Sequence, residues 1–323
     1  ILEEGITEAG AISSWLAAGT AHINYNVPMI PFYTFYSMFG FQRIGDQLWA
    51  AGDSKARGFL MGATSGRTTL NGEGLQHQDG QALLFASAYP SCLAYDPTFS
   101  YEVTVLIQRG IERMYRDQED IFYYITLLNE NYEQPAMPEG VEDNINRGMY
   151  LYKKPEQGKA QVQLMGSGAI LREAIFASEI LEKDYNIQSN VWSVLGINQL
   201  HREALIAEDW NRLHPSHPER KSYVEELLHD QAGPVIISTD YVKSYPEQIR
   251  RLIPGEVTIL GTDGYGRSDM RNSLRKFFHV DRYHIVIAAL QGLMKENVVD
   301  ADTVESAIKA YSIDPEEPHP INS

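Results

Sequence analysis

Apolar and polar positions alternate in blocks through the second half of the chain. Four apolar runs of strand length, separated by helix-length segments, are Gln161–Met165, Val191–Leu195, Val235–Ser238 and Val257–Leu260. Helical periodicity occurs at Ile170–Asp184, Gln199–Leu213, Ser244–Leu252, Ser268–Phe278, Asp281–Glu296 and Ala301–Tyr311. Because strands that alternate with helices usually pair in parallel, this half is predicted to be an α/β domain with a mostly parallel sheet.

The first half opens with helical periodicity over Thr7–Ala18, where Ile12, Trp15 and Leu16 share one face. Thr7 is a suitable N-cap for this helix. The next apolar segment is the aromatic run Met29–Phe41, in which Phe32, Tyr36 and Phe39 fall on one helical face. Their spacing predicts a second helix.

Glycine and polar residues then interrupt the apolar pattern twice. Residues 58–80 have an apolar start followed by many glycines, which predicts a strand that leads into a long functional loop. Residues 122–127 predict a strand, and the proline-bearing segment after it suits a connector. We therefore expect two α/β domains, at 1–137 and 138–323.

Composition restricts the possible partners and compartments. The 323 residues carry a net charge of -16, which disfavours a nucleic-acid partner because such binding rests on Lys and Arg. Cys92 is the single cysteine, so intrachain disulfides and cysteine metal clusters are excluded and a cytoplasmic location is expected. No apolar run has the roughly 20 residues that span a bilayer. The chain starts at Ile1 without a methionine, and we interpret it as a fragment whose first domain is incomplete at its N-terminus.

Two residues stand out as candidates for chemistry. Glu8 lies in the first turn of an otherwise apolar helix, where an acid can simply complement the helix dipole. Beside an aromatic run, the same carboxyl would also suit a flat heteroaromatic ligand that rings can stack on. His77 lies in the glycine-rich loop, where it is either an idle surface histidine or a proton donor to a bound substrate.

Longer phrases resemble a known family. The segment GITEAGA at 5–11, PMIPFYTFYSMFGFQRIGD at 28–46 and TSGRTTLNGEGLQHQDG at 64–80 are similar to the transketolase-like thiamine diphosphate enzymes. Together with LNENYEQPAMPEG at 128–140 and LGTDGYGRSDMRNSLRKFF at 260–278, they resemble most closely the homodimeric pyruvate dehydrogenase component of bacteria. The resemblance implies a pyrimidine-binding transketolase-like domain followed by a transketolase C-terminal-type domain.

The resemblance also assigns roles to cofactor-binding residues. Glu8 corresponds to the glutamate that binds the aminopyrimidine ring of thiamine diphosphate and promotes its activation by proton transfer. Ile6 corresponds to the apolar residue that props the cofactor in a bent conformation. Tyr36 and Phe39 correspond to the walls of the pyrimidine pocket.

On the substrate side, His77 corresponds to the family's loop histidine. Glu73 and Asn71 share its loop and are weaker substrate-binding candidates. Arg67 and Arg43 could bind a carboxylate, or could equally be structural arginines in ion pairs.

The resemblance implies oxidative decarboxylation of pyruvate and reductive acetylation of lipoyl groups, in a homodimer that serves a dihydrolipoyl acetyltransferase core. Mg²⁺ would accompany the cofactor, but a convincing metal site is not found in this sequence. Its ligands are therefore expected in an N-terminal part outside this chain, so the fragment carries half of an active site.

Other interpretations stay open. The chain could belong to a transketolase or another 2-oxo acid dehydrogenase, or act as a non-catalytic dimerisation and docking module. A nicotinamide oxidoreductase would rest on the glycine pair Gly166 and Gly168 alone, because the third glycine of that fingerprint is missing. A zinc site at His214 and His217 lacks further ligands.

Overall fold

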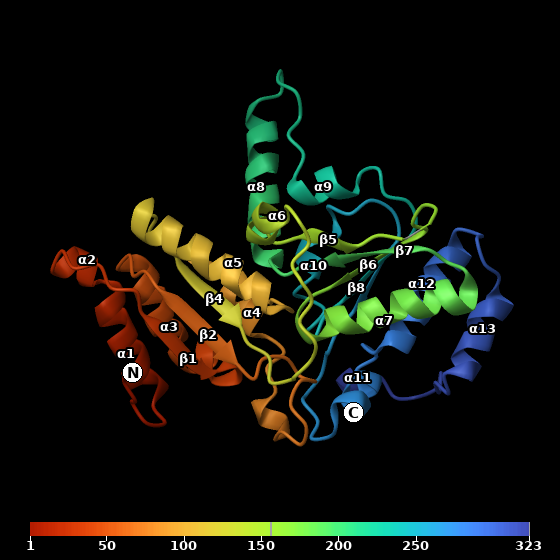
Figure 1. The fold of residues 1–323 in the computed structure, drawn as a ribbon, viewed down its shortest axis with the longest axis horizontal. Coiled ribbons are helices and arrows are strands. Elements are labelled where there is room, and N and C mark those ends of the chain that lie inside the picture. Colours follow the sequence, from red (N-terminus) through yellow and green to blue (C-terminus); the bar gives the residue numbers. More distant parts are fainter. Residues whose placement is uncertain (156, 323) are drawn as a thin grey trace.

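The computed structural model describes residues 1–155 and 157–322, which form two α/β units side by side (Figure 1). The first unit has an all-parallel sheet in the order β1-β2-β4-β3. Its strands are β1 Phe32–Tyr36, β2 Phe59–Ala63, β3 Cys92–Tyr95 and β4 Phe122–Thr126. The predicted strands in residues 58–80 and 122–127 are thus present.

Helices cover both faces of this sheet. They are α1 Glu8–Gly19, α2 Ala21–Asn24, α3 Gly40–Asp53, α4 Ala82–Ala86 and α5 Ser100–Ile111, with 3-10 turns at Ser37–Phe39 and Leu75–His77 and a π-helical turn at Glu112–Arg116. Successive strand residues point to opposite faces. Leu60 and Tyr124 accordingly join the core of α1 and α3, whereas Met61 and Ile125 join that of α5.

The second unit has five strands in the order β5-β7-β6-β8-β9. They are β5 Tyr150–Lys153, β6 Val162–Gly166, β7 Ser189–Ser193, β8 Val235–Ser238 and β9 Val257–Leu260. β5 pairs antiparallel with β7, and the other pairs are parallel. The predicted fold class, two α/β units with a mostly parallel second sheet, is confirmed, with β5 as an unpredicted edge strand.

Helices also cover both faces of the second sheet. They are α6 Glu142–Arg147, α7 Gly168–Tyr185, α8 Ile197–Leu213, α9 Tyr223–Leu228, α10 Glu247–Arg250, α11 Arg271–Phe277, α12 Arg282–Lys295 and α13 Ala301–Ala310, followed by a 3-10 turn at Pro320–Asn322. One hydrophobic cluster includes both Leu60 of β2 and Ile237 of β8, so the two units share a core. The domain boundary near residue 137 falls between β4 and α6 and stays a prediction. Among the described helices, none is long and apolar enough to cross a membrane.

The helix predicted from the first apolar segment is present as α1. The Thr7 hydroxyl caps it by accepting a hydrogen bond from the backbone N–H of Gly10. Ile12 and Trp15 are buried, as their spacing predicts. The first turn of α1, including Glu8, is therefore held in a defined position.

The helix predicted over Met29–Phe41 is wrong. This segment forms β1, which pairs with β2 along its whole length, and then a 3-10 turn. Consecutive aromatic and threonine residues favour an extended backbone, because their side chains pack well on a pleated surface. Phe35 is buried against Gly40, where an added Cβ would lie 2.1 Å from the ring. Helical structure begins only at Gly40, in α3.

The Glu102 carboxyl group in α5 joins the two units. Its Oε2 accepts hydrogen bonds from the backbone N–H groups of Thr98 at 2.6 Å and Phe99 at 2.8 Å. Its Oε1 accepts from the hydroxyls of Tyr150 at 2.7 Å and Ser193 at 2.8 Å, in β5 and β7. Four donors from both units therefore converge on one fully buried side chain.

We expect Glu102→Gln to destabilise the protein by about 2 to 4 kcal/mol, because an amide NH₂ would face donors from which it cannot accept. Urea unfolding measures the change. Glu112→Gln is a matched control, since Glu112 is one-third exposed in its pair with Arg109 and should contribute less than about 1 kcal/mol. Equal stability of the two variants would contradict the bridging role of Glu102.

Candidate functional site

A cavity of about 1180 Å³ opens between the start of α1, β1 and the glycine-rich loop. Its lining includes the predicted residues Ile6, Glu8, Tyr36, Phe39 and His77. These come from segments up to 71 positions apart in the sequence, and the fold brings them to one edge of the first sheet. The cavity is the candidate functional site.

The Glu8 carboxyl lies at the N-terminus of α1 and is mostly shielded from solvent, with 18% of its side chain exposed. Its Oε1 lies 2.9 Å from Nη1 of Arg43, which projects from α3. The Arg43 guanidinium also lies over the ring of Phe39, 4.0 Å from its centre. Arg43, one of the two arginines considered for carboxylate binding, thus orients Glu8 and a wall of the cavity.

Two aromatic rings pack against His77, the substrate-side candidate. The imidazole of His77 meets Tyr36 edge-on at 5.7 Å and Phe39 edge-on at 5.1 Å between ring centres. Tyr36 and Phe39 lie 5.5 Å from each other. His77 is half-buried in this aromatic corner, at the end of the 3-10 turn.

Glu73 lies behind this corner, almost completely buried. The Tyr36 hydroxyl donates a hydrogen bond to its Oε1, while its buried Oε2 has no hydrogen-bond partner among the described residues. Burial raises the pKa of the Glu73 carboxyl. Burial, together with the bond to Glu73, also raises the pKa of Tyr36 to about 12, so the phenol keeps its proton.

Asn71 and Arg67 lie outside the cavity lining. The Asn71 side chain accepts a hydrogen bond from the backbone N–H of Arg271, at 2.9 Å. The buried Arg67 guanidinium donates to the backbone carbonyls of Thr262, at 2.5 Å, and Gly264. Both residues therefore fasten the glycine-rich loop to the second unit, and a substrate-binding role of Asn71 stays a prediction.

Tyr33, a member of the aromatic run to which the sequence assigned no role of its own, also lines the cavity. Burial and the nearby negative charge of Glu8 raise the pKa of Tyr33 to about 12. The sequence holds no signal that distinguishes Tyr33, because it lies among other aromatic residues of the same run.

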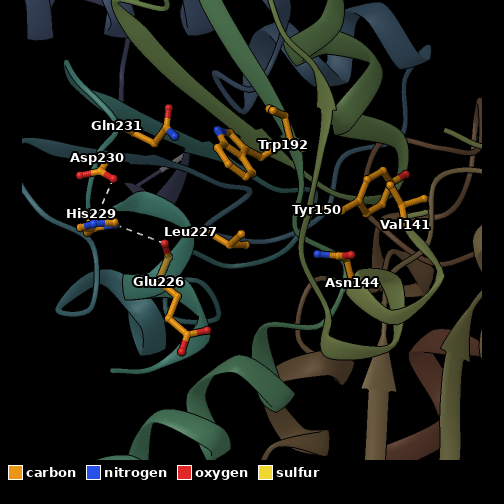
Figure 2. A pocket seen from close by; sticks show the side chains of 10 residues that line it. Val141, Asn144, Tyr150, Trp192, Glu226, Leu227, His229, Asp230 and Gln231 are labelled. Atoms are coloured by element: carbon orange, nitrogen blue, oxygen red, sulfur yellow. Dashed lines mark hydrogen bonds and ion pairs between the residues drawn. The ribbon is translucent and has the colours of Figure 1, made fainter. Parts of the chain in front are cut away.

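A second cavity of about 370 Å³ lies in the second unit, and Figure 2 shows its side chains. Trp192 and Tyr150 form part of its lining, and at its rim Nε2 of His229 lies 3.0 Å from Oδ2 of Asp230. None of the residues predicted from the sequence lines it. The described residues contain no group of three or more His, Cys, Asp or Glu side chains that could hold a metal ion.

The glycine pair of the nicotinamide alternative is also accounted for. Gly168 has φ +50, and a Cβ there would lie 2.6 Å from the carboxylate of Asp96. This buried acid, which accepts a hydrogen bond from the Ser167 hydroxyl, lies where a phosphate would have to bind. The turn therefore does not suit a dinucleotide.

Two family matches divide the chain. Residues 1–135 match the pyruvate dehydrogenase E1 component middle domain, and residues 148–281 match the transketolase-like TK C-terminal domain. The chain is 56% identical over 324 residues to the pyruvate dehydrogenase E1 component of Pseudomonas aeruginosa, covering 100% of the chain and 37% of the relative. It is 51% identical over 322 residues to that of Escherichia coli, covering 99% of the chain and 36% of the relative. The chain thus spans just over a third of these relatives.

Solved structures of transketolases share the fold. The enzyme from Leishmania mexicana has a TM-score of 0.63 at 17% identity, covering 83% of this chain and 34% of its own. That from Campylobacter jejuni also has a TM-score of 0.63, at 18% identity, covering 85% of this chain and 38% of its own. The fold is therefore that of the transketolase-like class. Within this class, the chain belongs to the pyruvate dehydrogenase E1 component family and matches the C-terminal part of its members.

The glycine-rich loop starts against a buried carboxyl, Asp240, just after β8. Its Oδ2 accepts a hydrogen bond from the backbone N–H of Thr68 at 3.1 Å. Gly66, with φ +84, allows this approach, because an added Cβ would lie 2.2 Å from the same oxygen. Burial raises the pKa of Asp240 to about 7, although the Arg275 guanidinium opposes the shift.

This raised pKa predicts a pH dependence of stability. The folded protein holds the Asp240 proton more tightly than the unfolded chain, so the resulting stability is present below about pH 4 and is lost as the pH rises through about 7. Raising the pH from about 5 to about 7 should lower the free energy of unfolding of the unchanged protein. For Asp240→Asn, this decrease should be smaller by about 2 kcal/mol.

Urea unfolding at both pH values measures this difference. Asp143→Asn is the control, because Asp143 is an exposed residue of α6 and should leave the pH dependence unchanged. An Asp240→Asn variant whose stability falls in parallel with the unchanged protein would refute the predicted linkage.

Proposed function

We propose that the chain acts as the C-terminal part of a pyruvate dehydrogenase E1 component. Such an enzyme decarboxylates pyruvate with thiamine diphosphate and reductively acetylates lipoyl groups. The observation that carries this proposal is one cavity that combines the Glu8 carboxyl with aromatic walls. The names of the relatives, at 50 to 56% identity, support it.

The residues present fit the aminopyrimidine half of the cofactor. Tyr36 and Phe39 offer ring faces and edges for a flat heterocycle. Arg43 engages only Oε1 of Glu8, which leaves Oε2 to hydrogen-bond a ring nitrogen. Ile6 lines the cavity and is fully exposed, so an apolar side chain is offered to a ligand. When bound, thiamine diphosphate supplies the carbon nucleophile that attacks the substrate carbonyl.

His77 is proposed to serve the substrate. Its imidazole lines the same cavity as Glu8 and could hydrogen-bond the pyruvate oxygen that gains a proton after attack. Glu73 shapes this corner through Tyr36, whose hydroxyl it holds. Tyr36 thereby keeps both its contact with His77 and its place in the cavity wall.

Mg²⁺ and the cofactor diphosphate are proposed to bind to the N-terminal part of the enzyme, since the described residues offer no metal cluster. We propose a cytoplasmic homodimer that transfers acetyl groups to the lipoyl domains of a dihydrolipoyl acetyltransferase core.

Glu8→Gln in the full-length enzyme should lower kcat for pyruvate decarboxylation by at least about 100-fold, because the amide cannot exchange a proton with the ring nitrogen. Carbon dioxide release with saturating thiamine diphosphate and Mg²⁺ measures this. Glu139→Gln, at an exposed position, should leave kcat unchanged. Turnover by Glu8→Gln within about twofold of the unchanged enzyme would rule out the assignment of Glu8.

A further inference from the structure

Two loops from different units lie against each other beside His77. The loop between β2 and α4 carries His77, and the loop between β9 and α11 comes from the second unit; Figure 1 shows them side by side, in orange and blue. The backbone N–H of Gly72 donates to the carbonyl of Asp269 at 2.9 Å. The Arg271 guanidinium donates through Nε to the carbonyl of Thr69 at 2.6 Å. The second unit therefore holds the His77 loop along much of its length.

Gln78, the residue after His77, makes two further links to the second unit. Its side chain is buried, with 1% exposed. Nε2 donates to the carbonyl of Arg267 at 2.7 Å, and Oε1 accepts from the backbone N–H of the same residue at 2.8 Å. The amide is thus paired with both the N–H and the C=O of one residue, as a neighbouring strand would be.

Glycines bring the two loops into backbone contact at this link. A Cβ on Gly266 would lie 2.3 Å from the carbonyl oxygen of Leu75 and 2.6 Å from Oε1 of Gln78. On the other side of the turn, a Cβ on Gly74 would lie 3.0 Å from Nδ1 of His77. Any displacement of the Gln78 amide is therefore transmitted directly to the backbone that carries the imidazole.

The imidazole itself has weak restraints. Across residues 1–155 and 157–322, no hydrogen bond to either ring nitrogen of His77 is found. The ring packs edge-on against Tyr36 and Phe39. This packing restricts the movement of the ring but does not fix the position of its two nitrogens. The position of these nitrogens must then come from the loop backbone.

We propose that Gln78 is a positioning residue for His77, and that it acts by pairing with the backbone N–H and C=O of Arg267 in the second unit. This inference rests on the proposed role of His77 as proton donor to the substrate. Proton transfer needs heavy atoms within hydrogen-bond reach, and a misplacement of about 1 Å can lower the rate by about 100-fold. The second unit thereby contributes to the reaction without lining the cavity at this point.

Gln78→Met tests the proposal in the full-length holoenzyme, because methionine keeps the length of the side chain and removes both hydrogen bonds. We expect kcat for pyruvate decarboxylation to fall about tenfold. Asn198→Leu is the matched control: Asn198 is equally buried and its amide also links the two units, by donating to the carbonyl of Leu83 at 3.1 Å. It should lower stability with kcat unchanged, so an equal fall in kcat for both variants would overturn the proposal.

The decisive readout is the effect of Gln78→Met when His77 is already absent. If Gln78 acts through His77, then Gln78→Met lowers kcat no further in a His77→Ala background, where kcat has already fallen about 100-fold. A full additional tenfold loss would show that Gln78 acts independently and would overturn the positioning role. Unchanged activity of His77→Ala alone would instead remove the proposed function of His77, so the two failures are distinguishable.

A second variant covers the case in which Gln78→Met does not fold. Gln78→Glu keeps an oxygen to accept from the Arg267 N–H but cannot donate to the Arg267 carbonyl. We expect a smaller loss of kcat, of about threefold, again without effect in the His77→Ala background. Full activity of Gln78→Glu, or a loss that persists without His77, would contradict the proposal.

Discussion

The parallel pairing of β1 with β2 is the constraint on which the site depends. In a parallel sheet, the carboxyl ends of neighbouring strands lie at the same edge, where ligands commonly bind. The register places Tyr36, the last residue of β1, opposite Ala63, the last residue of β2. The loop that follows β2 therefore leaves the sheet beside Tyr36, and His77 returns to pack against that ring. With a different register, the aromatic wall and the imidazole would lie apart.

Two acidic side chains at this edge have contrasting surroundings. Glu8 is half of an ion pair with Arg43 at the beginning of a helix, where the helix dipole also favours an anion. Glu73 is buried beside Tyr36, and its pKa is raised by the loss of solvent. Carboxyls in such different environments are suited to different tasks, and of these two Glu8 is the one that lines the cavity.

Much of the fold can be predicted from the sequence, but not evenly. In the second unit, β8 and β9 match their predicted ranges, because long apolar blocks are separated by clear helices. In the first unit, the spacing of the aromatic residues in Met29–Phe41 led to the prediction of a helix where β1 lies. Helix α5 was not predicted, because its sequence, SYEVTVLIQRGI, is rich in β-branched residues that favour strands. Its helical state comes from packing on β4, which local preference does not reveal.

The residues of the site likewise include some that the sequence predicts and one, Gln78, that it does not. Glu8, Tyr36, Phe39 and His77 were predicted from phrases that resemble a family, and the fold brings them into one cavity. Gln78 could not be recognised, because its partner Arg267 lies 189 positions away and its pairing exists only once the two units have docked. Contacts of this kind depend on tertiary structure and leave no local pattern.

The proposed function requires that the Glu8 carboxyl and its neighbouring rings receive an aminopyrimidine. A crystal structure of the full-length enzyme with thiamine diphosphate tests it most directly. We expect a Glu8 carboxyl oxygen within about 3 Å of a pyrimidine nitrogen, with Tyr36 and Phe39 beside the ring. A pyrimidine bound elsewhere, with Glu8 engaged only by Arg43, would contradict it.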